Sequence, residues 1–217
     1  MPQLFHPRAN TIARVVVVCV LVSPFVALGV HAAFMYSPYF TDQGNTPIQP
    51  VPFSHKHHVL EDGIDCRFCH TGVETSMRAG VPPTHTCMEC HSQLYTHQKM
   101  LEPVRASFAG DTPLRWQQVN RLPDYVYFDH AVHVKDGVGC TTCHGEVEEM
   151  PLMRQAKPLT MHWCIDCHRA PGPNLRPPDE IFATHWRPHN NKEESRLLMD
   201  HYGVKTTHLT DCSTCHR

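Results

Sequence analysis

The chain has 217 residues, of which 41% are hydrophobic and only 8% aromatic, and its net charge is −2 when the histidines are counted as neutral. This near-neutral balance, without a basic stripe, argues against a nucleic-acid partner. The unusual feature is the number of histidines and cysteines, 19 and 11 respectively. We therefore expect the chemistry of the chain to lie with these two residue types.

The first element in chain order is an apolar segment, residues 15–36, with the sequence VVVVCVLVSPFVALGVHAAFMY. Its length of about 22 residues is enough to span a hydrocarbon core of ~30 Å as a helix. Arg8 and Arg14 precede it, and the next Lys or Arg is Lys56. By the positive-inside rule, residues 1–14 are expected in the cytoplasm and the rest of the chain on the periplasmic side of a bacterial cytoplasmic membrane.

A cleaved signal peptide is the alternative interpretation of this segment, with a tolerable cleavage site at residues 30–32. The apolar run is longer than the usual apolar region of a signal peptide, about 7–15 residues, so the sequence favours a retained single-pass anchor. Residues 37–52 then form a proline-rich linker.

The remaining residues, 53–217, contain the motif Cys-x-x-Cys-His five times, here numbered first to fifth in chain order. On a helical turn, positions i, i+3 and i+4 share one face, so the two cysteines can form thioethers to one porphyrin edge while the histidine reaches the iron. The motif therefore predicts five c-type haems. The residues are Cys66, Cys69 and His70; Cys87, Cys90 and His91; Cys140, Cys143 and His144; Cys164, Cys167 and His168; and Cys212, Cys215 and His216.

Zinc sites and disulfides are the two rival interpretations of ten paired cysteines. Neither requires a histidine directly after the second cysteine of every pair. Given the histidine content, five such histidines by chance have a probability of roughly one in 10⁵ to 10⁶. Haem attachment is therefore the interpretation that accounts for both residue types.

The motifs are arranged in two repeats, residues 53–93 and 128–171, followed by a terminal segment, residues 172–217, with the fifth motif. Each repeat begins with Phe-x-His-x-x-His, and a helical turn presents its two imidazoles side by side. We expect these histidines to be distal iron ligands that serve two neighbouring haems. They are His55 and His58 in the first repeat and His130 and His133 in the second.

The distal ligand of the fifth haem is open, and Met150 and His208 are taken as its first candidates. Further candidates are Met153, Met161, His97, His185, His189 and His201. A methionine ligand would raise the potential of its haem relative to the bis-histidine haems. Three further histidines, His57, His85 and His162, are expected to be bystanders.

The expected fold is a small multihaem cytochrome in which the haems form much of the core. Setting aside the first 40 residues leaves 177 (217 − 40), or about 35 per haem, which is fewer than an independent domain needs. With 19 prolines and 11 glycines, we expect short α-helices and loops, little strand and one N-terminal transmembrane helix. Residues 94–108 and 191–202 read as helices, the second capped by Asn190 or Asn191.

The repeated Phe-x-His-x-x-His and Cys-x-x-Cys-His pattern resembles the class III multihaem cytochromes of the c7 and c3 type. That resemblance implies that His55 ligates the haem of His70 and His130 that of His144, while His58 and His133 serve neighbouring haems. The segments VPFSHKHHVLEDGIDCRFCHTGVE, VPPTHTCMECHSQ, LPDYVYFDHAVHV and QAKPLTMHWCIDCHR together look like the pentahaem cytochrome subunit of alternative complex III, a bacterial quinol-oxidising complex.

This closer resemblance implies an electron-transfer subunit, not an enzyme by itself, that passes electrons from the quinol-oxidising part of the complex to a periplasmic acceptor. The implied partners are an iron–sulfur subunit, polytopic quinol-binding membrane subunits and a mono-haem cytochrome. The terminal acceptor would be a soluble cytochrome, a copper protein or an oxidase. Two alternatives remain, a membrane-anchored multihaem quinol dehydrogenase and a multihaem reductase with one open haem.

Overall fold

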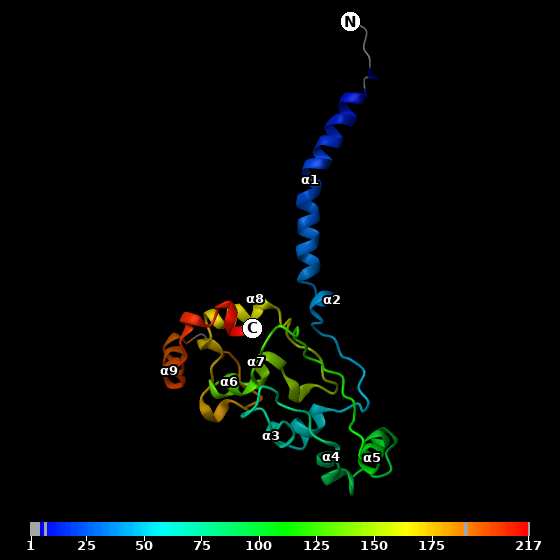
Figure 1. The fold of residues 1–217 in the computed structure, drawn as a ribbon, viewed down its shortest axis with the longest axis vertical. Helices are drawn as coiled ribbons and strands as arrows, with labels where there is room; N and C mark the ends of the chain where they lie inside the picture. Colours follow the sequence, from blue (N-terminus) through cyan, green and yellow to red (C-terminus); the bar gives the residue numbers. More distant parts are fainter. Residues whose placement is uncertain (1–4, 7, 189–190, 217) are drawn as a thin grey trace. The chain divides into compact units, whose positions relative to one another are not determined.

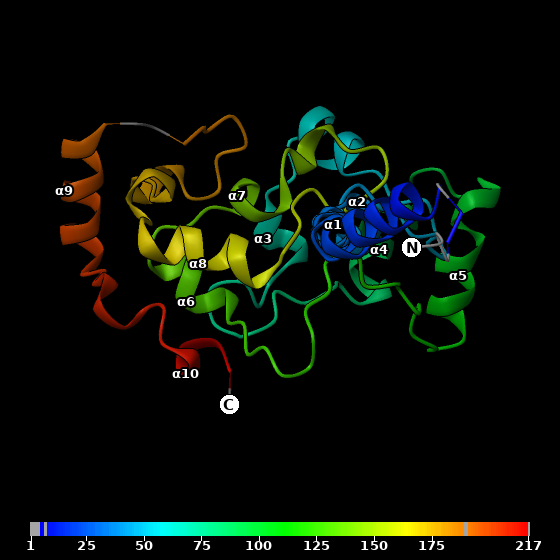
Figure 2. The ribbon, with the colours of Figure 1, turned by 90° about the horizontal axis from the view of Figure 1, so that it is seen from above.

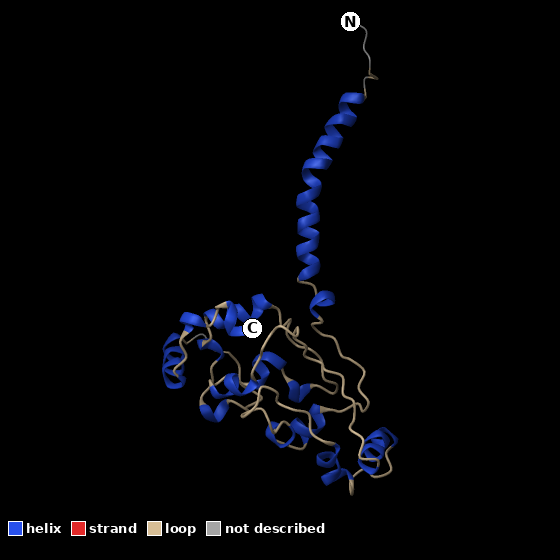
Figure 3. Ribbon diagram, in the orientation of Figure 1, coloured by secondary structure: helices blue, strands red, loops and turns tan. Residues whose placement is uncertain are grey.

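The computed structural model describes residues 5–6, 8–188 and 191–216, and these form helices and loops (Figures 1 and 3). Within these ranges β structure is limited to two isolated bridges, Val126 with His216 and Val138 with Leu175. The expected fold class, helical and rich in loops, is therefore confirmed. The chain divides into two compact units, Met1–Asp42 and Gln43–Arg217, which are described separately.

The first unit contains helix α1, Ala9–Met35, and the short helix α2, Pro38–Thr41. Helix α1 has a mean hydropathy of 2.5 in its most apolar window, and it begins six residues before the predicted apolar segment (15 − 9). At 1.5 Å per residue its 27 residues extend about 40 Å, which is long enough to cross a membrane. Ser37 ends this segment by capping α2, because its hydroxyl accepts a hydrogen bond from the backbone of Phe40.

The second unit is built from short helices joined by long loops (Figure 2). Its α-helices are α3 (Cys66–Cys69), α4 (Thr84–His91), α5 (Glu102–Ala109), α6 (His130–Lys135), α7 (Cys140–His144), α8 (Met161–Arg169), α9 (Lys192–Tyr202) and α10 (Cys212–Cys215). Between them lie the π-helical turn η1 (Lys56–Glu61) and the 3₁₀ turns η2 (Lys99–Leu101), η3 (Val147–Glu149), η4 (Gly172–Asn174), η5 (Pro178–Glu180) and η6 (Thr206–His208).

Two segments free of haem motifs were expected to be helical, with different outcomes. Helix α9 begins after Asn191, whose side chain accepts hydrogen bonds from the backbone of Glu193 and Glu194, as predicted for one of the two possible caps. The other possible cap, Asn190, lies outside the described residues. The prediction of a helix over residues 94–108 was wrong at its start, because the α-helix in this segment, α5, begins only at Glu102. Pro103 has no N–H and is tolerated only in the first turn of a helix.

The side chains alone form only a small apolar core. Val73, Val134 and Ile181 make one buried cluster, with Phe182 packed against it. The fully buried side chains include a cation, Arg176. Its guanidinium donates hydrogen bonds to the hydroxyl of Thr141 and to three backbone carbonyls, those of Glu180, Ile181 and Ala183. So small an apolar core fits the expectation that bound groups supply much of the interior.

Candidate haem-binding sites

All five Cys-x-x-Cys-His motifs lie on short helices or at their ends: α3, α4, α7, α8 and α10. Local residues start several of these turns. Asp65 caps α3 by accepting a hydrogen bond from the backbone of Arg67, and Thr160 caps α8 through the backbone of Trp163. The helical turn places the two thiols and the histidine of a motif on one side, as the spacing predicted.

Four of the five motif histidines face a second histidine ring. Each pair joins a motif histidine to a histidine of one Phe-x-His-x-x-His segment. Two imidazoles bound to one metal from opposite sides, at about 2.0 Å per bond, leave their ring centres roughly 6 Å apart. The pairs and ring-centre distances are His55 with His70 (6.5 Å), His58 with His91 (6.2 Å), His130 with His144 (6.3 Å) and His133 with His168 (6.1 Å).

The pairs differ in the angle between their ring planes. The rings of His55 and His70 are 9° from parallel, and those of His130 and His144 are 4° from parallel. The other two pairs are less alike, with 27° between His133 and His168 and 71° between His58 and His91. We call the nearly parallel pair of each repeat its inner pair and the other its outer pair. The two outer pairs differ from each other in ring angle.

The hydrogen bonds of these rings select the tautomer that an iron ligand needs. A backbone carbonyl only accepts, so a ring nitrogen beside one must carry the proton, which leaves the lone pair of Nε2 free for a metal. Seven of the nine Nδ1 atoms in the four pairs and His216 have such a partner. They are His58 with Ser54, His70 with Gly80, His91 with Leu94, His130 with Met77, His133 with Asp129, His168 with Leu209 and His216 with Tyr125.

The two remaining Nδ1 atoms belong to the inner pairs. That of His144 lies 2.9 Å from the side-chain amide of Asn120, and that of His55 is buried without a hydrogen-bond partner. Burial, followed by the charge of neighbouring histidines, lowers the pKa of each of these two histidines to about 4. Both rings are therefore neutral at neutral pH, the form that binds a metal.

A phenylalanine packs against both histidines of each Phe-x-His-x-x-His segment. Phe53 stacks on His58 with ring centres 4.4 Å apart and meets His55 edge-on at 4.9 Å. Phe128 repeats this arrangement in the second repeat, 4.5 Å from His133 and 4.8 Å from His130. This explains the phenylalanine of the repeated sequence pattern, which orients both imidazoles of one turn.

The thiols show how the motifs lie relative to one another. Those of Cys66 and Cys140 lie close together, and this contact, followed by burial, raises the pKa of Cys140. Burial, and then the nearby thiol of Cys87, raise the pKa of Cys69. The first motif therefore has the second on one side and the third on the other.

Contacts between thiols also show the neighbours of the third, fourth and fifth motifs. Burial and the nearby thiols of Cys167 and Cys164 raise the pKa of Cys143 to about 12. Burial and the thiol of Cys215 raise the pKa of Cys164. The spatial order of the motifs is thus second, first, third, fourth and fifth, which differs from their order in the chain.

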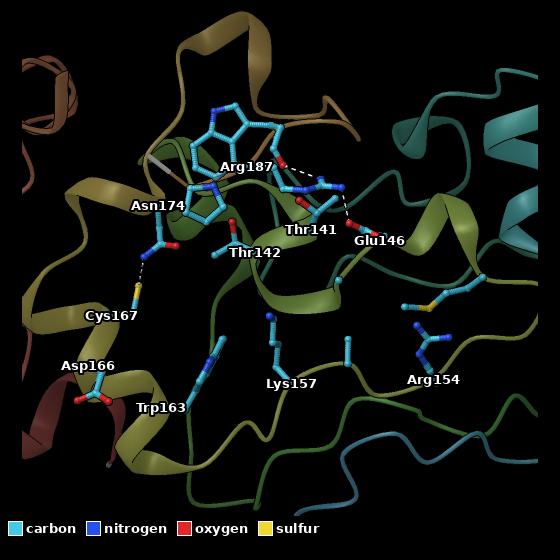
Figure 4. Close-up of a pocket in the computed structure, with 15 residues that line it drawn as sticks. Thr141, Thr142, Glu146, Arg154, Lys157, Trp163, Asp166, Cys167, Asn174 and Arg187 are labelled. Carbon is cyan, nitrogen blue, oxygen red and sulfur yellow. Dashed lines mark hydrogen bonds and ion pairs between the residues drawn. The ribbon is translucent and has the colours of Figure 1, made fainter. Parts of the chain in front are cut away.

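A cavity of about 570 Å³ borders the fourth motif, because the thiol of Cys167 lines it (Figure 4). Asn174 donates a weak hydrogen bond to this sulfur, at 3.8 Å. Three basic side chains also line the cavity, and one of them, Arg187, is paired with Glu146. The other two are Arg154 and Lys157. A cavity with a thiol and several cations fits a planar apolar group that carries carboxylates, as haem does.

The fifth motif has a different environment. The ring of His216 has the phenol of Tyr125 as its aromatic neighbour, with centres 5.7 Å apart. Of the two first candidates for its distal ligand, Met150 is buried beside Gly145 in the second repeat, and His208 is exposed and hydrogen-bonded to Asp211. A further candidate, His189, lies outside the described residues. The identity of this ligand stays a prediction.

The histidines expected to be bystanders lie at the surface and face carboxylates. His57 contacts Glu61, His85 lies 3.8 Å from Glu89, and the third member of this set, His162, lies 3.3 Å from a carboxylate one turn ahead, Asp166. Each histidine and its carboxylate partner lie on the solvent-exposed side of their helix. Sequence reasoning missed Asn120, because it lies in a segment without a haem motif and no local pattern marks it.

Comparison with known proteins gave one informative match. The chain is 31% identical over 173 residues to the protein named "Menaquinone reductase, multiheme cytochrome c subunit" of Nitratidesulfovibrio vulgaris (strain Hildenborough). The match covers 77% of this chain and 67% of that relative. No protein-family model matches the chain.

Proposed function

Because the chain belongs to the family of multihaem cytochrome c subunits, we propose that it is the electron-transfer subunit of a membrane-bound, quinone-linked redox complex. The observation that supports this most is the set of four facing imidazole pairs, each of which includes one Cys-x-x-Cys-His histidine. Covalently bound c-type haems would supply reversible one-electron chemistry at these positions. We propose five of them, one per motif.

The residues of the chain would then hold and separate the haems. The cysteines of each motif attach the macrocycle, and the paired imidazoles close both faces of the iron. A closed iron exchanges electrons and has no position for a substrate, which favours an electron carrier over a reductase. The proximity of Cys66 to Cys140, and of Cys164 to Cys215, supports one continuous row of attachment sites.

The two ends of this row are the second and the fifth motif, and these are the places where electrons would enter and leave. Cys90 of the second motif and Cys212 of the fifth are both exposed, whereas Cys140 in the middle is more buried. We propose that one end faces the quinone-linked subunits and the other the electron acceptor. The helix Ala9–Met35 would anchor the chain in the bacterial cytoplasmic membrane, with the haem-binding unit on the periplasmic side.

The finer identity that we propose is the pentahaem subunit of an alternative complex III. Its partners would be an iron–sulfur subunit, polytopic quinol-binding subunits and a mono-haem cytochrome, and it would deliver electrons to a soluble cytochrome, a copper protein or an oxidase. The match to a menaquinone reductase subunit supports a second candidate, in which electrons run towards the quinone. The same row of sites serves either direction, because the potentials of the partners set the direction of flow.

The experiment that tests the proposal uses the full chain purified with its native partners. Pyridine haemochrome analysis and the intact mass of the subunit should give five covalent haems. Electron paramagnetic resonance of the oxidised complex should show low-spin iron at the four paired sites, with no binding of carbon monoxide to these sites after reduction. Fewer than four low-spin haems, or no covalent haem, would contradict it.

The direction of flow needs a separate measurement on the same complex. Menaquinol or ubiquinol should reduce the haems if the complex oxidises quinol, and an added quinone should reoxidise pre-reduced haems if it acts as a quinone reductase. Under either outcome the chain is an electron carrier. A subunit that turns over a small substrate without its partners would instead support the reductase alternative.

A further inference from the structure

We propose that Asn120 is the positioning residue of the third site, where its side-chain amide accepts a hydrogen bond from Nδ1 of His144 and sets the strength of this iron ligand. This inference rests on the proposed function, because it takes His144 to be a ligand. It assigns a role to the segment 94–127, which carries no haem motif.

The contact itself is close and enclosed. The amide nitrogen Nδ2 of Asn120 lies 2.9 Å from Nδ1 of His144, and the amide oxygen Oδ1 is buried without a hydrogen-bond partner. Asn120 lies 24 residues before His144, so the contact depends on the path of the whole connecting segment. Gln118 donates a hydrogen bond to the backbone carbonyl of Asn120 and helps to fix this path.

The chemistry of the ligand decides the orientation of the amide. An imidazole that gives the lone pair of Nε2 to iron carries its proton on Nδ1, so this atom must donate. An NH₂ group cannot accept that proton, whereas the oxygen of the same amide can. The two orientations of an asparagine side chain have nearly the same shape. Rotation of the amide by 180° therefore places the unpartnered Oδ1 of Asn120 against Nδ1 of His144 when iron is bound.

The third site is in this respect unlike the other sites. Among the described motif histidines, His144 is the one whose Nδ1 faces a side chain, while His70, its equivalent in the first repeat, donates to the backbone carbonyl of Gly80. A backbone carbonyl stays the same under any side-chain substitution. At the third site the acceptor is a side chain, so its charge and polarity can be changed.

The acceptor controls how much electron density the imidazole donates. A stronger acceptor gives the ring more imidazolate character, stabilises ferric over ferrous iron and lowers the potential of that haem. A carboxylate in place of the amide should therefore lower the potential, and an apolar side chain of similar volume should raise it. Loss of a merely structural contact would shift both variants in the same direction or in neither.

The test compares three substitutions at Asn120 in the complex with its native partners. Spectroelectrochemical titration should show one haem potential lowered in Asn120→Asp and the same potential raised in Asn120→Leu, each by about tenfold in the ratio of ferric to ferrous stability. This corresponds to about 59 mV for one electron. Asn120→Gln keeps an amide, so the potential of this haem in that variant should be closer to that of the unchanged protein than in either of the other two variants.

The control is Gln117→Leu, which removes an exposed polar side chain from the same segment and leaves both the hydrogen bonds of the Gln117 backbone with Gln49 and the amide of Asn120 in place. It should leave all five potentials unchanged. Potentials unaffected by both Asp and Leu, or shifted with one sign by both, would overturn the role of Asn120. Because the haem content of every variant is measured, absence of covalent haem from the unchanged protein would count against the proposed function itself.

Discussion

In the first repeat the rings of Phe53 and His58 lie 4.4 Å apart, and in the second repeat those of Phe128 and His133 lie 4.5 Å apart. The inner imidazole pairs match equally well. The partners of the inner rings do not match, because the Nδ1 atom of His55 has no hydrogen-bond partner and that of His130 contacts the carbonyl of Met77.

The comparison shows which features follow from the duplicated sequence and which depend on the segments that surround each repeat. The packing of the phenylalanine on the two imidazoles involves residues within five positions of one another, so both copies have it, although the first copy is π-helical and the second α-helical. The Nδ1 partners of the inner rings come from other segments, such as Asn120 and Met77, which lie in different surroundings for each repeat. Equal ligand sets can therefore have unequal redox properties. Four predictions test this comparison.

The largest effect is expected from replacing an outer distal ligand with methionine. Changing His133 to Met should raise the potential of the fourth haem, because the thioether stabilises ferrous iron, and axial ligands span a range of about 0.8 V. His58→Met should do the same at the second haem. Redox titration measures both. His57→Met, next to His58 but paired with Glu61 at the surface, is the control. Five unchanged potentials would remove the substituted histidine from the ligand set.

The second prediction concerns the residue before the first cysteine of each inner motif, Gly139 in one repeat and Asp65 in the other. A Cβ atom on Gly139 would clash with the guanidinium carbon of Arg176, which is fully buried. Gly139→Ala should therefore destabilise the protein by about 1–3 kcal/mol through overpacking. Denaturant unfolding of the holoprotein measures this.

The matched change in the first repeat, Asp65→Ala, removes a helix cap and an exposed ion pair with Arg67, and it adds no atom that could clash. It should cost about 1 kcal/mol. A Gly139→Ala variant as stable as the unchanged protein would mean that Arg176 can move away at no cost, which its four hydrogen bonds argue against.

The third prediction tests the phenylalanine shared by the repeats. Phe53→Leu and Phe128→Leu should each destabilise by about 0.5–1.5 kcal/mol, the contribution of an aromatic pair beyond its buried area. Because the ring distances in the two repeats agree closely, the two losses should be equal within error. A large difference between them would show that the repeats are not equivalent at this position.

The smallest contrast is expected from the angles between the rings of the two outer pairs. The rings of His58 and His91 are 71° apart, and those of His133 and His168 are 27° apart. Perpendicular imidazoles give a more anisotropic low-spin ferric signal than parallel ones. The most anisotropic signal should therefore disappear in His58→Met and persist in His133→Met. Loss of that signal only in the second variant would contradict the ring angles.

The sequence predicted the parts of the structure that depend on local spacing. It predicted short helices under every Cys-x-x-Cys-His motif, the cap at Asn191, and the long apolar helix. The implied neighbours His55 with His70 and His130 with His144 lie face to face, and their ligand roles stay predictions. Which motif each outer histidine faces was not predictable, because that depends on how two distant helices pack.

Other features depend on contacts between distant segments and left no trace in the sequence pattern. The buried position of Arg176 is an example, because an arginine between two proline-rich stretches reads as a surface residue. The contact between Asn120 and His144 is another. In both cases an ordinary polar residue is given its role by the fold around it.

The contact between the thiols of Cys66 and Cys140 joins the same position of the two repeats. A residue that touches its own counterpart is the signature of twofold symmetry, as in an isologous dimer. The four motifs of the repeats accordingly follow one another in space as second, first, third and fourth, so the two inner sites are neighbours. In a head-to-tail arrangement, an inner site would instead be followed by an outer site in each repeat. The two repeats are thus arranged like the halves of an isologous dimer fused into one polypeptide, and the fifth motif extends this arrangement at one end only.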